Sequence, residues 1–234
     1  MDRISRKELK QDRFAVEVTH AAGYLAEHRA EAIRYGIAGL VVLVLISGFF
    51  LWRSHSSRAR REALTAALEV RMAPVGQAQP DSALRSFATE QEKTKAEIAA
   101  FSDIASKYPG SVEGVTAQFY LGAIAAGQGN LAGAEKAFKE VADSGNADYA
   151  SLAKLSLADI YKSQGKTAEA EQLLRSLVAK PTMFVSKEEA TIALARYIGA
   201  TNPEEARKLL MPLTASRTAV SRVAAEEISA LGSK

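Results

Sequence analysis

The sequence predicts an all-α protein in which one apolar helix, long enough to cross a membrane, precedes an α-solenoid of paired helices. Three observations predict this fold class. An uncharged apolar run lies near the N-terminus, 44 alanines accompany an aromatic content of only 7%, and a later segment repeats at a spacing of 36 residues. High alanine content with few aromatic side chains is typical of closely packed helices, and a fixed spacing of this size indicates a repeat architecture.

Composition excludes several classes of function. The chain has 234 residues and no cysteine, which excludes disulfides, thiolate metal sites and cysteine nucleophiles. The three histidines, His20, His28 and His55, all lie in the first quarter of the chain. The remainder lacks the residues of most hydrolase triads and zinc sites, and a net charge of +3 is too small for a strong nucleic-acid footprint. We predict no enzymatic activity, no cofactor, no metal and no nucleic-acid partner.

The N-terminal tail, residues 1–34, is predicted to form a charged amphipathic helix. Phe14, Val18, Ala21, Leu25 and Ala32 fall on one face at helical spacing, and charged residues fill the other faces. Such a helix lies on a membrane surface or docks on a partner protein. A solvated helical extension is an equally good interpretation.

The run from Tyr35 to Trp52 is the predicted single-pass transmembrane helix. It has eighteen residues without a charge, and about 18–20 helical residues cross most of a hydrocarbon core. Tyr35 and Trp52 lie at its ends, where amphipathic rings favour the headgroup level. Two alternatives are a buried core helix and a cleaved signal peptide, since Ser54-His55-Ser56 loosely fits a cleavage site.

The orientation of this helix depends on how its flanking charges are counted. The tail carries seven Lys and Arg residues and the opposite flank carries five, although the residues nearest the membrane favour a cytoplasmic C-terminal side. A short tail with seven positive charges resists export, whereas a long domain translocates largely regardless of charge. We therefore predict a cytoplasmic N-terminus and a C-terminal domain outside the cytoplasm.

Residues 53–82 are predicted to form a juxtamembrane helix and a linker. The helix runs from Arg53 to Arg71, and the linker, Met72–Ser82, contains two prolines and a glycine that interrupt helical structure. Four arginines of this segment are candidates for contact with anionic lipid headgroups, and they are Arg53, Arg58, Arg60 and Arg61. A solvated flank that determines topology is the alternative interpretation.

Internal repetition defines the predicted domain at residues 83–234. Tyr120–Phe138 aligns with Ser156–Leu174 at a shift of 36 residues. The alignment pairs small residues at helix crossings and glycines at turns, namely Gly122 with Ala158, Gly129 with Gly165, and Ala134 with Ala170. This pattern resembles the tetratricopeptide repeat, in which two antiparallel helices form each unit. Thr167 is the predicted N-cap of the second helix in the second unit.

The flanking segments extend the array to three or four helix pairs. Ser186 and Asn202 are predicted to cap the helices of a weaker copy that lacks the turn glycine. Upstream, the stretch before Tyr108-Pro109-Gly110-Ser111 reads as the second helix of another copy, with its first helix at Ser82 to about Glu92. Ala219–Leu231 is the predicted C-terminal capping helix. A generic helical bundle is the alternative architecture.

Arrays of this kind present a concave groove lined by the first helix of each pair. On this alignment the predicted lining is Thr116, Phe119, Tyr120, Ala123, Leu152, Leu155, Asp159 and Lys162. Phe119 and Tyr120 are adjacent, so they cannot both face the groove. Some members of the tetratricopeptide class bind carboxylate termini through Lys and Asn at fixed positions, which here hold Leu155, Asp159, Thr191 and Ala195. That clamp is absent, and the partly apolar groove suits a helix or an extended apolar segment.

The order of segments resembles a wider family. A charged tail, one anchor, Trp52, His55, Ala59 and Arg60 just past it, and an alanine-rich array are similar to the membrane-anchored tetratricopeptide-repeat-like family that includes the ancillary subunit of the bacterial Sec translocon. The resemblance implies an inner-membrane protein with a periplasmic domain, and translocon subunits, exported chains or envelope chaperones as partners. Alternatives are a scaffold for cell-wall or outer-membrane assembly and a structural membrane protein that forms homo-oligomers.

Overall fold

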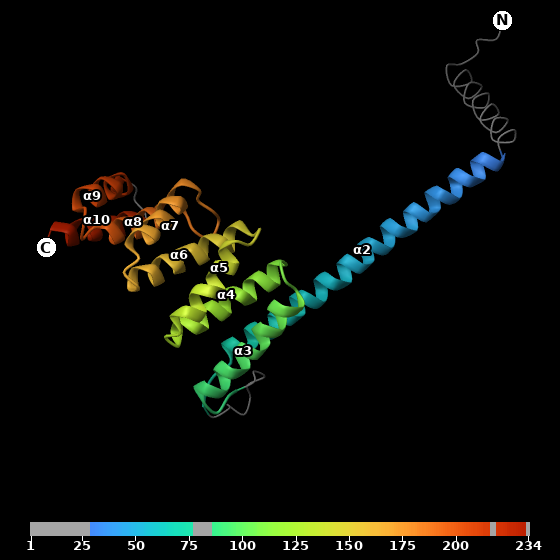
Figure 1. Cartoon of the computed structure of the whole chain (residues 1–234), viewed down its shortest axis with the longest axis horizontal. Helices are drawn as coiled ribbons and strands as arrows, with labels where there is room; N and C mark the ends of the chain where they lie inside the picture. The colour runs from blue at the N-terminus through green and yellow to red at the C-terminus, as the bar shows by residue number, and fades with distance from the viewer. Residues whose placement is uncertain (1–28, 77–85, 216–218, 233–234) are drawn as a thin grey trace, which may run out of the picture. The chain divides into compact units, whose positions relative to one another are not determined.

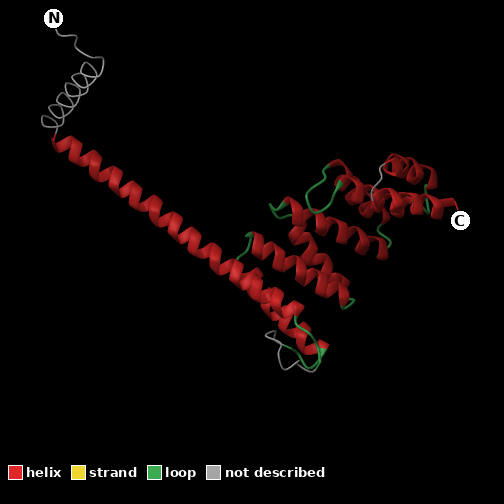
Figure 2. Ribbon diagram, turned by 180° about the vertical axis from the view of Figure 1, so that it is seen from behind, coloured by secondary structure: helices red, strands yellow, loops and turns green. Residues whose placement is uncertain are grey.

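The computed structural model describes residues 29–76, 86–215 and 219–232, and in this part of the chain every regular element is a helix (Figures 1 and 2). The predicted all-α class is therefore confirmed for these residues. The helices are α2 (Arg29–Met72), α3 (Glu90–Lys107), α4 (Val112–Gly127), α5 (Leu131–Ala142), α6 (Ala147–Ser163), α7 (Thr167–Ala179), α8 (Lys187–Ile198), α9 (Pro203–Leu210), the short 3-10 helix η1 (Met211–Ala215) and α10 (Ala219–Gly232). The chain forms two compact units, Met1–Arg58 and Ala59–Lys234.

The first unit contains the N-terminal part of α2. Large apolar side chains are exposed along it, including Leu40, Leu43 and Leu45 at 64%, 64% and 66%. Within the described residues, no helix is both long and apolar enough to cross a membrane, so the anchor predicted at Tyr35–Trp52 is not identified there. The predicted tail helix lies almost wholly outside the described residues, as do the side chains of Trp52 and Arg53.

The second unit is a stack of antiparallel helices, each packed on the next in sequence order from α3 to α9 (Figure 1). The last turns of α2 pack against α3, because Ala67 is buried together with Phe101 and Ile104. This end of α2 is therefore the first helix of the first pair. The predicted helix at Ser82–Glu92 is wrong, since α3 begins at Glu90 with Thr89 as its N-cap.

Small residues allow the paired helices to approach closely, as the repeat pattern predicts. A Cβ atom on Gly122 would lie 2.8 Å from a ring carbon of Phe138, which is 2% exposed. In the next copy Ala158 and Ala170 take the small positions and are 2% and 0% exposed. Apolar burial at these crossings is the main stabilising contribution to the array.

The turns within the two best copies are the same structure displaced by 36 residues. Gly129 and Gly165 have φ angles of 75° and 73°, which glycine adopts without steric cost. The amide of Asn130 donates to the carbonyl of Ala125, and the amide of Lys166 donates to that of Tyr161. These bonds form the Schellman motif, which satisfies the last carbonyls of a helix. Lys166 rather than the predicted Thr167 occupies the N-cap of α7.

The third copy follows a different register in its first helix. Leu194 and Ala195 of α8 are buried in the core as Leu157 and Ala158 of α6 are, which is a spacing of 37 residues. In the second helix, Ala206 matches Ala170 at a spacing of 36. The stretch between these core positions is one residue shorter in the third copy, because α8 ends four residues after Leu194 whereas α6 ends six residues after Leu157. The turn that follows α8 has four residues, and the turn that follows α6 has three. The N-caps predicted at Ser186 and Asn202 are confirmed.

Candidate functional site

A cavity of about 620 Å3 lies on the second unit between α6, α8 and α10. We call it the groove. Its lining is Leu155, Asp159, Lys162, Leu174, Ser186, Glu189, Ile192, Ala193, Arg196, Tyr197, Ala219, Val220 and Val223. α6 and α8 are first helices of their pairs, and α10 follows α9 in the position of another first helix. The groove thus lies on the surface that such arrays use for binding.

Each of the three helices contributes one stripe of side chains to the groove. On α6 the stripe is Leu155, Asp159 and Lys162, at spacings of four and three residues. On α8 it includes Ile192 and Arg196, also four residues apart. Residues at these spacings share one helix face, so periodicity alone brings them together. α10 adds Val220 and Val223, which complete an apolar floor.

Acidic and basic side chains line the groove beside this floor, and the contacts that they make within the chain differ. The Arg196 guanidinium lies 2.6 Å from the Glu227 carboxylate. The Lys162 ammonium lies 5.6 Å from the centre of the Tyr197 ring, within the range of a cation–π contact. Loss of hydration raises the pKa of the Asp159 carboxyl, although the charge of Lys162 acts in the opposite direction.

The structure brings only part of the predicted lining into the groove. Leu155, Asp159 and Lys162 line it, while Leu152 packs against the core beneath. The predicted residues of α4 lie elsewhere. Thr116 is buried, with its hydroxyl donating to the carbonyl of Val112 at 2.7 Å, and Ala123 packs against the apolar cluster that contains Phe138 and Leu157.

Phe119 and Tyr120 join different clusters rather than the groove. The Phe119 ring lies 5.4 Å from that of Phe138, whereas Tyr120 stacks on Phe101 at 4.9 Å between ring centres. Tyr120 also receives the Arg71 guanidinium at 4.8 Å from its centre. Both rings therefore have well-defined packing partners, and they also lie edge to face with each other at 6.1 Å between ring centres.

Sequence reasoning missed the lining residues of α8 and α10. A constant shift of 36 residues pointed to Thr191 and Ala195, which are buried at 6% and 1% exposure. The shift of 37 residues places Ile192 and Arg196 at the positions of Leu155 and Asp159 instead. The signal available in the sequence was the spacing of apolar residues in α8, because Ala190 and Leu194 lie four residues apart and both face the core.

The predicted lipid-contact arginines lie in different environments. Arg60 forms an ion pair with Glu113 at 3.2 Å, and the two side chains are 24% and 12% exposed. It is therefore directed toward α4. Arg58 and Arg61 are exposed, and Tyr35 is 76% exposed.

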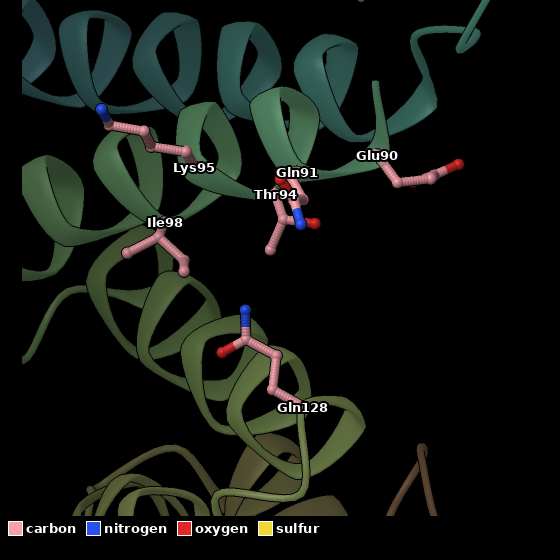
Figure 3. A pocket seen from close by; sticks show the side chains of 6 residues that line it. All are labelled: Glu90, Gln91, Thr94, Lys95, Ile98 and Gln128. Carbon is pink, nitrogen blue, oxygen red and sulfur yellow. The ribbon is translucent and has the colours of Figure 1, made fainter.

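A second hollow, of about 380 Å3, lies where α3 faces the end of α4 (Figure 3). Its walls are mostly long polar side chains, and Ile98 is the large apolar residue among those that line it. Within the described residues, no three His, Cys, Asp or Glu side chains are grouped so that they could hold a metal ion. The groove is therefore the better candidate for a binding site.

Comparisons with known proteins agree with this architecture. Two solved structures are similar to the chain, a Podosopora anserina putative kinesin light chain with nearly identical TPR-like repeats and a single-substitution variant of it. Their identities are 16% and 15%, their TM-scores 0.50 and 0.51, and the matches cover 62% of this chain and 80% and 79% of theirs. At such identity the likeness concerns the fold alone.

The family comparison covers more of the chain. No curated protein sequence matches it. Residues 31–190, however, match the model of the tetratricopeptide repeat-like domain. Since this match spans most of the chain and includes its two best repeats, the protein belongs to the tetratricopeptide repeat-like domain family.

Proposed function

We propose that this protein is a non-enzymatic adaptor that binds a segment of a partner protein in the groove between α6, α8 and α10. Tetratricopeptide-like arrays are scaffolds for protein interaction. The observation that carries the proposal is the groove itself, a cavity of about 620 Å3 with an apolar floor on the face formed by first helices.

The composition of the groove suits a peptide segment rather than a reacting substrate. Apolar side chains of a partner would be removed from water against Leu155, Ile192 and Val220, at about 25 cal/mol per Å2 of buried area. Charged groups at the rim would fix its orientation. The described residues that line the groove include no histidine or cysteine, the side chains that most often serve as bases and strong nucleophiles.

The proposal includes a single-pass membrane anchor at Tyr35–Trp52. It is supported by the eighteen uncharged residues between Arg34 and Arg53 and by the exposed apolar side chains of this part of α2, of which Val44 is 62% exposed. Side chains of this kind are more stable in lipid than in water. The exposed Arg58 and Arg61 would then lie near lipid headgroups.

In this proposal the N-terminus is cytoplasmic and the repeat domain lies in the periplasm of a bacterial cell. The partners are subunits of the Sec translocon, exported chains or envelope chaperones. The support is the resemblance in segment order and the seven basic residues of the N-terminal tail. Two alternative functions are compatible with the same anchor and array. One is a scaffold for cell-wall or outer-membrane assembly. The other is a self-associating membrane protein, in which a second copy would contact the first.

Topology mapping tests the location. A reporter that is active only outside the cytoplasm, fused after Lys234, is expected to be active, and a cytoplasmic reporter at the same position is expected to be silent. The same pair of reporters fused before Met1 should give the opposite result. Activity of the cytoplasmic reporter after Lys234 would contradict the proposed orientation.

Cross-linking in native membranes followed by affinity purification of the full chain tests the partners. The expected products contain translocon subunits or periplasmic proteins. Recovery of cell-wall or outer-membrane assembly factors would favour the first alternative, and cross-linked copies of this chain alone would favour self-association. Recovery of cytosolic proteins alone would contradict all three.

A further inference from the structure

The charges of the groove are not equally available to a partner. Both cations already have contacts within the chain, since Arg196 pairs with Glu227 at 2.6 Å and Lys162 lies over the Tyr197 ring. Among the described residues, neither Asp159 nor Glu189 has a side-chain hydrogen bond or an ion pair, although both line the groove. The groove therefore offers two carboxylates that form no hydrogen bond or ion pair with the described residues, beside an apolar floor.

The helices explain why these carboxylates form no ion pair among the described residues. Asp159 lies on α6 three residues before Lys162, but that ammonium is held over the Tyr197 ring. Glu189 lies in the first turn of α8, where the Ser186 hydroxyl accepts a hydrogen bond from its backbone amide at 3.1 Å, and Glu189 is exposed. The helix dipole favours a negative charge at this end of α8, but a dipole does not replace a counter-ion.

From this arrangement we propose that the groove selects a partner segment in which lysine or arginine residues are interspersed among apolar side chains. The apolar residues would contact Leu155, Ile192 and Val223, and the cations would approach Asp159 and Glu189. An acidic segment would place like charges together in the groove, which weakens binding. This inference rests on the proposed function and specifies the chemical class of its partner.

The expected selectivity is moderate. Ion pairs at a partly exposed rim contribute about 0.2–1 kcal/mol each. Two such pairs correspond to an affinity about twofold to thirtyfold higher for a basic segment than for an uncharged segment of the same apolar sequence. Raised salt should reduce this ratio because it screens exposed charges.

The test uses the full-length chain and three fluorescent synthetic peptides that share one apolar sequence. Two positions of the peptide are both lysine, both glutamine or both glutamate. Fluorescence anisotropy is expected to give the tightest binding for the lysine peptide and the weakest for the glutamate peptide. The double variant Asp159→Asn/Glu189→Gln should bind all three peptides with similar affinity.

The matched control is Asp143→Asn/Glu188→Gln, which removes the same two charges outside the groove. Asp143 is exposed at the end of α5, and Glu188 is exposed beside Glu189 in the same helical turn. The control should keep the preference of the unaltered chain for lysine. Helical circular dichroism of both variants checks that they are folded.

Two outcomes would overturn the inference, and they are distinguishable from failure of the proposed function. Equal affinity of the unaltered chain for the three peptides would exclude charge selection while leaving the groove as the binding surface. Equal loss of the lysine preference in both double variants would assign it to net charge rather than to the groove. Failure of the proposed function would appear instead as partner cross-links that lie outside the groove.

Discussion

At the scale of single residues, Gly122 and Gly127 show how strongly the environment determines the effect of one added methyl group. Both lie in α4 with helical backbone angles, but a Cβ atom on Gly122 would lie 2.8 Å from the Phe138 ring, whereas one on Gly127 would have no neighbour within 4 Å. The ring cannot move aside easily because Phe119 packs against it at 5.4 Å between ring centres.

We therefore expect Gly122→Ala to lower the free energy of unfolding by about 1–2 kcal/mol, because overpacking outweighs the better helix propensity of alanine. Gly127→Ala should raise it by up to about 1 kcal/mol. Urea unfolding followed by circular dichroism measures both. Equal effects of the two substitutions would contradict the close approach of α4 and α5 at Gly122.

Glu135 links α5 to the turn before α7. Its carboxylate accepts hydrogen bonds from Lys139 at 2.6 Å and from Gln164 at 3.0 Å, and Lys166 lies 3.6 Å away. The Lys139 bond first, then the Gln164 bond and the nearby positive charges, lower the pKa of Glu135 to about 2. Because the folded-state pKa is depressed, the stabilisation is present above the unfolded value of 4.5 and is lost as the pH falls toward 2.

Glu135→Gln should therefore lower the free energy of unfolding by about 1 kcal/mol at neutral pH, a value limited by solvent screening. The difference between variant and unaltered chain should shrink as the pH falls below 4.5. Urea titrations at several pH values measure it. A difference that stays constant down to pH 2 would show that the carboxylate charge is not its source.

Asp159 is expected to behave in the opposite way. Loss of hydration raises its pKa above the ordinary value of 3.8, so the ionised form is less stable in the folded chain, and protonation at low pH relieves this cost. Asp159→Asn should slightly raise the Tm at neutral pH and have a smaller effect in acid. A lower Tm for Asp159→Asn at neutral pH would contradict the assigned environment.

At the scale of helices, the end of α2 is the least expected element of the array. The sequence predicted a helix there, but its role was hidden because the loop to α3 is long and its glycine, Gly76, lies four residues after the end of α2 rather than two. Burial identifies the role, since Ala67 is 1% exposed within the cluster of Phe101 and Ile104, whereas Ala66 is exposed. A salt bridge of 3.4 Å from Arg71 to Glu97 adds a second link between α2 and α3.

Ala67→Asp and Ala66→Asp form a matched pair that tests this packing. A carboxylate at position 67 has no partner in the apolar cluster, so we expect a loss of about 3 kcal/mol or more in the free energy of unfolding. Ala66→Asp should change it by less than about 0.5 kcal/mol. Hydrogen exchange of the α3 amides should accelerate in Ala67→Asp alone. Similar exchange in both variants would contradict the pairing of α2 with α3.

The same scale shows how far sequence periodicity predicts structure. The 36-residue shift correctly predicted α4 to α7, their small crossing residues and the glycine turns, because each feature depends on local chain geometry. It failed in α8, where the core residues follow those of α6 at a spacing of 37 residues rather than 36, so that a different face of this helix lines the groove. The N-cap of α7 was also misplaced, since Lys166 takes that position without a side-chain cap.

At the scale of the whole molecule, three helices form the groove, and the sequence predicted the groove-lining residues of these helices with unequal success. Leu155, Asp159 and Lys162 were predicted because α6 has a well-matched counterpart in α4. Val220 and Val223 were not, because α10 was interpreted as a cap and a cap has no second copy against which its faces can be aligned. The residues of a binding surface that crosses several repeats are therefore predicted only as well as the least regular repeat.

The central claim is that partner proteins bind in the groove, and site-specific photo-crosslinking in living cells tests it most directly. A photoreactive amino acid is placed in the full chain either at Val223, in the groove, or at Lys136, exposed on α5. We predict crosslinked partner proteins from position 223 and none from position 136. Partner adducts from position 136 in the absence of adducts from position 223 would contradict the account.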